Sequence, residues 1–149
     1  MKRESEWWIL EYDILISYTR YMKEEERMNF CWVTINVANM EKSLNFYRDV
    51  VGLSVDRSMK PSANMEIAFL GKGETKVELI FDAKSDKRNY GDDISLGFEV
   101  ESVDKTMESL KKRNIKIHSG PHQPNPMIKF FYVLDPDGLK VQFVENIAK

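Results

Sequence analysis

The second half of this chain repeats the first half in outline. The stretch that begins at Trp32 aligns with the stretch that begins at Ser95 at a constant offset of 63. The aligned pairs include Val33 with Leu96, Ile35 with Phe98, Asn39 with Ser102, and Lys42 with Lys105. A second pair of segments, KVELIF from Lys76 and KVQFVE from Lys140, aligns at an offset of 64. Two matches at nearly one spacing indicate a duplicated unit of about 60 residues, longer than a solenoid repeat and present only twice. We therefore predict one fold made of two similar halves.

The first half has the pattern of a strand, a helix and three more strands. Apolar residues alternate with polar ones from Val33 to Val37, the period of a half-buried strand. Asn39 suits a helix N-cap and Gly52 a left-handed C-cap, which predicts a helix over about 40–51. Three short strands are then expected at 53–57, 65–70 and 75–81.

The second half follows the same order. A strand is expected over 94–100, a helix capped by Ser102, and strands near 115–118, 128–134 and 139–144. The proline-broken HSGPHQPNP, from His118, is expected to be a loop, and Asp135-Pro136-Asp137-Gly138 predicts a hairpin turn. We divide the domain, residues 29–149, into module one (29–83), a polar linker (84–93) and module two (94–149).

Residues 1–28 precede the repeat. Their apolar positions fall near helical spacing and predict an amphipathic helical extension that covers the domain's own sheet or a partner subunit. The apolar run Trp7 to Leu10 is too short for a signal-peptide core or a membrane span, so no membrane association is expected.

Charge and cysteine content narrow the function classes. The net charge of −2 comes from the first 28 residues, and the remaining chain is balanced, which argues against nucleic-acid binding. The single cysteine, Cys31, excludes an intramolecular disulfide and suits a reducing compartment, so we expect a cytoplasmic protein. By alternation Cys31 falls on the apolar side of the first strand and is expected to be a packed thiol.

Three features together resemble the vicinal oxygen chelate superfamily, which includes glyoxalase I, bleomycin-resistance proteins and extradiol dioxygenases. They are SLNFYRDVVGL after a first strand, a second strand-helix unit 63 residues on, and DPDG before an alternating strand. The resemblance covers residues 30–145. It implies an α+β fold in which two paired βαβββ modules form a curved mixed sheet around a concave cavity, and it implies a homodimer.

Metal-dependent members of that superfamily place their ligands at four positions. By resemblance these positions hold Trp32, Glu78, Ser95 and Gln142, so only Glu78 is a strong ligand. Catalytic metals need about three protein ligands and an open position. We therefore expect no divalent metal cofactor. A relocated site of His118, His122 and Glu78 is an alternative, although a proline-rich loop does not place an i, i+4 pair on one helical face.

The remaining expectation is a lined cavity that binds a small molecule. Strand alternation turns one set of side chains inward. This set is Trp32, Thr34, Asn36, Glu78, Ile80, Ser95, Gly97, Glu99, Gln142 and Val144. By resemblance to related proteins, Tyr132 and His122 are also expected to reach this cavity. The first hypothesis is a metal-independent module that binds a small aromatic or cationic compound, as bleomycin-resistance proteins do. The alternative is a glyoxalase I-like lyase, or another small-molecule-modifying enzyme, with Glu78 or Glu99 as general base.

Overall fold

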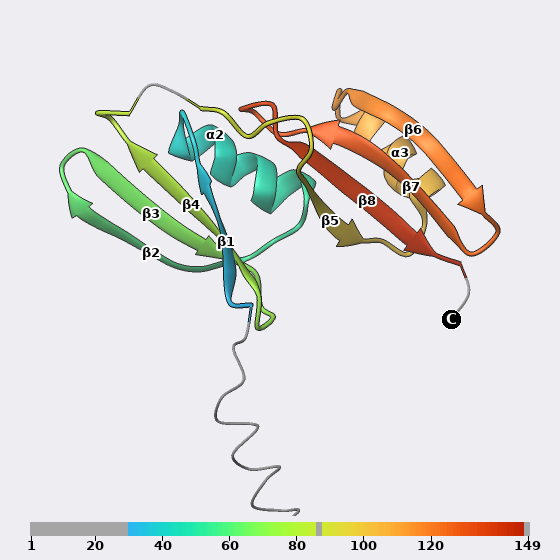
Figure 1. The fold of residues 1–149 in the computed structure, drawn as a ribbon, viewed down its shortest axis with the longest axis horizontal. Helices are drawn as coiled ribbons and strands as arrows, with labels where there is room; N and C mark the ends of the chain where they lie inside the picture. Colours follow the sequence, from blue (N-terminus) through green and yellow to red (C-terminus); the bar gives the residue numbers. More distant parts are fainter. Residues whose placement is uncertain (1–29, 86–87, 148–149) are drawn as a thin grey trace, which may run out of the picture. The chain divides into compact units, whose positions relative to one another are not determined.

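The computed structural model describes residues 30–85 and 88–147, and the expected N-terminal helix lies outside them. Module one contains, in chain order, β1 (Trp32–Asn36), α2 (Met40–Asn45), the π-helical turn η1 (Phe46–Val50), β2 (Val55–Ser62), β3 (Met65–Leu70) and β4 (Lys76–Asp82). Module two contains β5 (Ser95–Glu99), α3 (Val103–Lys112), β6 (Ile117–Asn125), β7 (Ile128–Leu134) and β8 (Lys140–Asn146). Figure 1 shows the same succession of elements twice, from blue to green and from yellow to red.

Each module forms a four-stranded mixed sheet. The strand orders are β1-β4-β3-β2 in the first sheet and β5-β8-β7-β6 in the second. In each sheet the opening strand pairs in parallel with the closing strand, and the registers are equivalent, with Trp32 opposite Lys76 and Ser95 opposite Lys140. The predicted α+β fold of two βαβββ modules is therefore confirmed.

Both helices begin where the sequence places their caps. The Asn39 side chain accepts a hydrogen bond from the Lys42 amide at 2.8 Å, and the Ser102 hydroxyl accepts one from the Lys105 amide at 3.3 Å. Asn114, with φ of 58°, follows the second helix in the left-handed region, as Gly52, with φ of 89°, does after η1. The first helix is not uniform, since its second half is the π turn η1. None of the helices in the described residues is long and apolar enough to cross a membrane.

Two strands extend through prolines that the sequence analysis treated as breaks. β6 runs through most of HSGPHQPNP, and β2 continues past its expected end at residue 57 to Ser62, across Pro61. Both are edge strands. A proline on an edge strand can turn its missing donor away from the ladder, so it does not end the pairing. The expected loop at 118–126 is wrong for this reason.

One face of each sheet packs into a shared core. The core contains apolar residues of both modules and both helices; its fully buried side chains include Ile35, Leu79, Val103, Phe131 and Val141. Phe131 and Phe143 stack with ring centroids 5.2 Å apart.

Cys31 precedes β1 and is exposed, so its expected burial is wrong, because the strand that would have turned it inward begins only at Trp32.

A buried hydrogen bond joins the two modules. The Tyr47 hydroxyl, on η1, donates to the Asp135 carboxylate at 2.9 Å. Tyr47 is fully buried and Asp135 is 5% exposed. The backbone amides of Asp137 and Leu139 also donate to this carboxylate, each at 2.9 Å, so the DPDG turn is organised around it. Burial raises the pKa of Asp135 and these hydrogen bonds oppose that shift, while burial and the neighbouring Asp135 raise the pKa of Tyr47.

Further contacts near β1 reinforce the junction. The Ala38 amide donates to the Asp137 carboxylate at 3.1 Å. From the linker, Arg88 donates to the Val37 carbonyl and Tyr90 to the Asn36 carbonyl. The end of β1 is therefore held both by module two and by the linker.

Tyr47→Phe should remove the bond between the modules and lower the free energy of unfolding by about 1–2 kcal/mol at pH 7, because a buried acceptor loses a donor. Losing that donor also raises the folded-state pKa of Asp135 further. The folded variant then holds a proton that the unfolded chain releases. The deficit should therefore grow as pH rises through the folded-state pKa of Asp135 in the unsubstituted chain, which lies above the unfolded value of about 3.9, and it should level off above the folded-state pKa of the variant.

Urea unfolding of both chains at pH 4 and pH 7 measures this deficit. Tyr132→Phe is the control, since Tyr132 is only half-buried and bonds within its own sheet. Equal stability of Tyr47→Phe and the unsubstituted chain at pH 7 would contradict a structural role for the bond.

Candidate functional site

The face of each sheet that points away from the core carries the residues that the sequence analysis assigned to a site. In the first sheet, four residues follow one another across the four strands: Thr34 lies opposite Glu78, Glu78 opposite Phe69, and Phe69 opposite Arg57. Trp32 lies two residues before Thr34 on the same face. We call Trp32, Thr34, Arg57, Phe69 and Glu78 the first half-site.

Three side chains of the first half-site form an aromatic and cationic surface. The Trp32 ring meets the Phe69 ring edge to face, with centroids 5.5 Å apart and planes at 78°. The Arg57 guanidinium lies over the same Phe69 ring, 4.1 Å from its centroid. Phe69 is only 5% exposed, whereas Trp32 remains 43% exposed. The indole therefore offers a stacking surface whose position is fixed by a buried neighbour.

Glu78 is the buried polar group of this surface. Its carboxylate accepts a hydrogen bond from the Thr34 hydroxyl on the adjacent strand. The carboxylate is held on one side by this hydroxyl and is bordered on the other by Phe69. It can accept a further hydrogen bond or a proton from a bound molecule.

The corresponding face of the second sheet carries an aromatic group around an amide. We call Ser95, His122, Phe130, Tyr132 and Gln142 the second half-site. Tyr132 lies opposite Gln142, and the Gln142 amide donates to the Tyr132 hydroxyl at 3.0 Å. The His122 ring centroid lies 5.3 Å from that of Phe130 and 6.2 Å from that of Tyr132.

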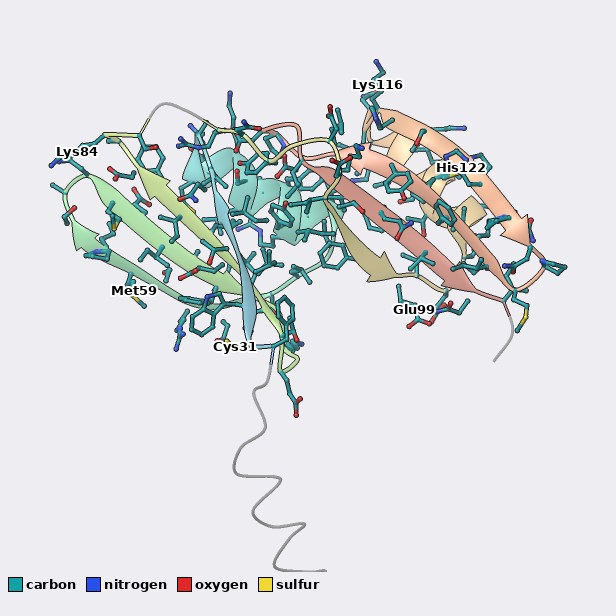
Figure 2. All side chains as sticks on the ribbon, viewed as in Figure 1. Cys31, Met59, Lys84, Glu99, Lys116 and His122 are labelled. Atoms are coloured by element: carbon teal, nitrogen blue, oxygen red, sulfur yellow. The ribbon has the colours of Figure 1, made fainter. Side chains whose placement is uncertain are left out.

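The other predicted residues extend these two faces. Asn36 lies opposite Ile80 at the end of β1, Gly97 opposite Gln142, and Glu99 opposite Val144. Figure 2 shows Glu99 near the end of β5 and His122 on the outer strand β6. The structure thus places the predicted residues on the expected faces but divides them between two sheets. Their roles in binding or catalysis stay predictions.

Arg57 and Phe69 are functional candidates that the sequence analysis missed. Alternation from Val55 gives no usable signal, because the pairing register shifts between Val55 and Arg57. The repeat does not help either, since the outer strands of the two sheets, β2 and β6, carry different irregularities.

Three cavities adjoin these faces. The first, of about 480 Å³, lies between β1, the linker and β5, and Thr34 and Asn36 are among its lining residues. The second, of about 270 Å³, includes Ser95, His118 and Tyr132. The third, an open groove of about 610 Å³, includes His122, Phe130 and Tyr132.

The described residues at the superfamily's ligand positions do not fit a catalytic metal. Within residues 30–85 and 88–147, no three histidine, cysteine, aspartate or glutamate side chains come together as a ligand group. This finding also excludes the relocated His118, His122 and Glu78 set from the described part of this chain. At the superfamily's positions, Trp32 packs on Phe69 and the Gln142 amide is bonded to Tyr132. Indole and hydroxyl groups at Trp32 and Ser95 are poor ligands for zinc, nickel or iron.

The sequence of this chain is similar to those of several named proteins. A lactoylglutathione lyase of Haemophilus influenzae is 31% identical over 129 residues, covering 80% of this chain and 93% of that protein. A probable lactoylglutathione lyase of Synechocystis is 30% identical over 127 residues, covering 77% and 93%. A methylmalonyl-CoA epimerase of Mus musculus is 30% identical over 93 residues, covering 56% and 52%.

Solved structures show the same fold. Leishmania major glyoxalase I superposes with a TM-score of 0.68 at 21% identity, covering 80% of this chain and 87% of that chain. The antibiotic-binding protein TnmS3 from Streptomyces gives a TM-score of 0.62 at 17% identity, covering 81% and 98%. The model of the glyoxalase/bleomycin resistance protein/dioxygenase superfamily matches residues 29–143. The chain therefore belongs to this superfamily.

Proposed function

We propose that this protein binds a small planar aromatic molecule without a metal cofactor. The observation that carries the proposal is Trp32, which stands where the superfamily resemblance expects a metal ligand and presents a half-exposed indole fixed against Phe69. A fixed aromatic surface binds a planar molecule with little loss of side-chain freedom. The polar groups of Glu78, Tyr132 and Gln142 would orient that molecule by hydrogen bonds.

A homodimer would complete this site. Among the described residues, each half-site lies on a sheet face that remains partly exposed, whereas a pocket for a small molecule buries most of the ligand's surface. We propose that the second half-site of one chain covers the first half-site of its partner, so that two equivalent sites form. A stable assembly of this kind buries about 1,200–2,000 Å² in total.

The second candidate function is a lyase of the glyoxalase I type. Two observations favour it: Glu78 retains the acidic position of the superfamily, and relatives about 30% identical carry the name lactoylglutathione lyase. Glu78 would act as general base on a bound hemithioacetal, with Glu99 as the other candidate base. The absence of a fitting metal set among the described residues weighs against this function.

Trp32→Ala should weaken binding of the neutral fluorescent probe N-phenyl-1-naphthylamine by about tenfold or more, because the stacking surface is lost. Fluorescence of the probe, titrated with the protein, measures this change. Trp32→Phe should retain most of the affinity. Met127→Ala removes a different exposed apolar side chain and should leave affinity unchanged. Equal affinity in Trp32→Ala and the unsubstituted chain would refute the proposed site.

Purified full-length chain should carry far less than one zinc, nickel or iron ion per chain by elemental analysis, and chelation should not change probe affinity, since the donor set is incomplete. Turnover of the glutathione–methylglyoxal hemithioacetal, followed with and without added nickel or zinc, separates the two functions. Metal-stimulated turnover that Glu78→Gln abolishes would replace the binding proposal with the lyase.

Solution scattering at micromolar concentration should give the mass of two chains, because residues 30–85 and 88–147 of one chain leave both half-sites open. The measurement should be repeated over a tenfold range of concentration. A strictly monomeric species that still binds the probe at Trp32 would contradict the shared site.

A further inference from the structure

The geometry points to an anionic group on the aromatic ligand, held by Arg57. This inference rests on the proposed aromatic binding at Trp32 and adds the chemical class of the molecule. It begins from the contact of the Arg57 guanidinium with the buried Phe69 ring, 4.1 Å from the centroid. Arg57 stands on β2, an exposed edge strand, so its position depends on this ring.

Arg57 is a cation without a counter-charge in the described part of the chain. The nearby lysines are engaged elsewhere. Lys76, on this face, is 3.6 Å from Asp56 and donates to the Gly71 carbonyl at 2.7 Å. Lys60 points to the opposite face of the sheet, where it is paired with Glu66 at 3.1 Å. Within residues 30–85 and 88–147, Arg57 has no carboxylate or carbonyl partner, and its guanidinium contacts the ring of Phe69. A guanidinium placed over a ring face still has N–H donors that the ring does not use, and these can bind a planar anion.

Glu78 does not neutralise this cation. The register places Phe69 between Glu78 and Arg57, and the Glu78 carboxylate already holds the Thr34 hydroxyl. The first half-site therefore has a buried acid at one side and a more exposed cation at the other. A bound molecule meets the cation first, so an anionic ligand is favoured over a cationic one.

Both the indole and the guanidinium contact the single ring of Phe69, so one small molecule can touch both. Its aromatic part would lie on Trp32, and a carboxylate or sulfonate would pair with Arg57. The ligand class is therefore an aromatic carboxylate or a similar planar organic anion. Arg57 is a specificity-determining residue in this arrangement.

A matched pair of probes tests the inference. 8-Anilinonaphthalene-1-sulfonate carries the same aromatic frame as N-phenyl-1-naphthylamine with one added sulfonate. Arg57→Gln should weaken binding of the sulfonate probe about tenfold, because a charge-assisted contact is lost at a partly exposed position. The same substitution should change the affinity for the neutral probe by less than about twofold. Arg57→Lys should fall between, because the charge remains and the planar fork does not. Added salt should weaken binding of the sulfonate probe more in the unsubstituted chain than in Arg57→Gln.

Lys60→Gln is the matched control, with the same loss of charge on the same strand, and it should change neither probe by more than about twofold. An equal effect of Arg57→Gln on both probes, or no effect on either, overturns the anion site and leaves aromatic binding intact. An equal loss of affinity for the sulfonate probe in Lys60→Gln and Arg57→Gln also overturns the anion site, because the effect then comes from the general charge of the surface. Failure of both probes to bind, or binding that ignores Trp32→Ala, overturns the aromatic site and the anion site together.

Discussion

The Tyr47 hydroxyl donates a buried hydrogen bond to the Asp135 carboxylate where the two modules share one core, and this bond helps to fix the two site-bearing sheets. A buried carboxylate is costly unless its oxygens are hydrogen-bonded. Here one donor comes from module one and two come from the turn of module two itself. The carboxylate therefore accepts all three hydrogen bonds only when the modules are packed together. The bond thereby couples the packing of η1 to the conformation of the DPDG turn.

Much of this fold follows from periodicity and repetition in the sequence. Alternation assigns Thr34 and Glu78 to one face, and the repeat assigns Gln142 to the equivalent face of the second sheet, as the registers confirm. Within Phe130–Leu134 alternation leaves both faces open, whereas the register places Tyr132 opposite Gln142, and Phe131 and Val133 are fully buried. Capping residues at Asn39 and Ser102 also mark the helix starts correctly, since each satisfies a free backbone amide.

The parts that the sequence did not reveal depend on irregular backbone and on neighbours distant along the chain. The bulge between Val55 and Arg57 breaks strict alternation, so the face of Arg57 becomes known only from its pairing with Phe69. Prolines in β6 resemble a loop until the strand is seen to lie at the edge of the sheet. The division of the site between two sheets is likewise a tertiary property, because a repeat indicates similar modules without stating how their faces are joined.

The π turn η1 makes the two modules non-interchangeable. Across this turn the spacing between equivalent residues falls from 63, at Leu44 and Met107, to 62, at Gly52 and Asn114, so module one contains one residue more. A π turn accommodates such an extra residue within a helix. It also leaves consecutive side chains, Phe46 and Tyr47, both buried. A chimera with the regular helix α3 in place of α2 and η1 would make the two modules alike, but it would lack a side chain positioned to donate a hydrogen bond to Asp135.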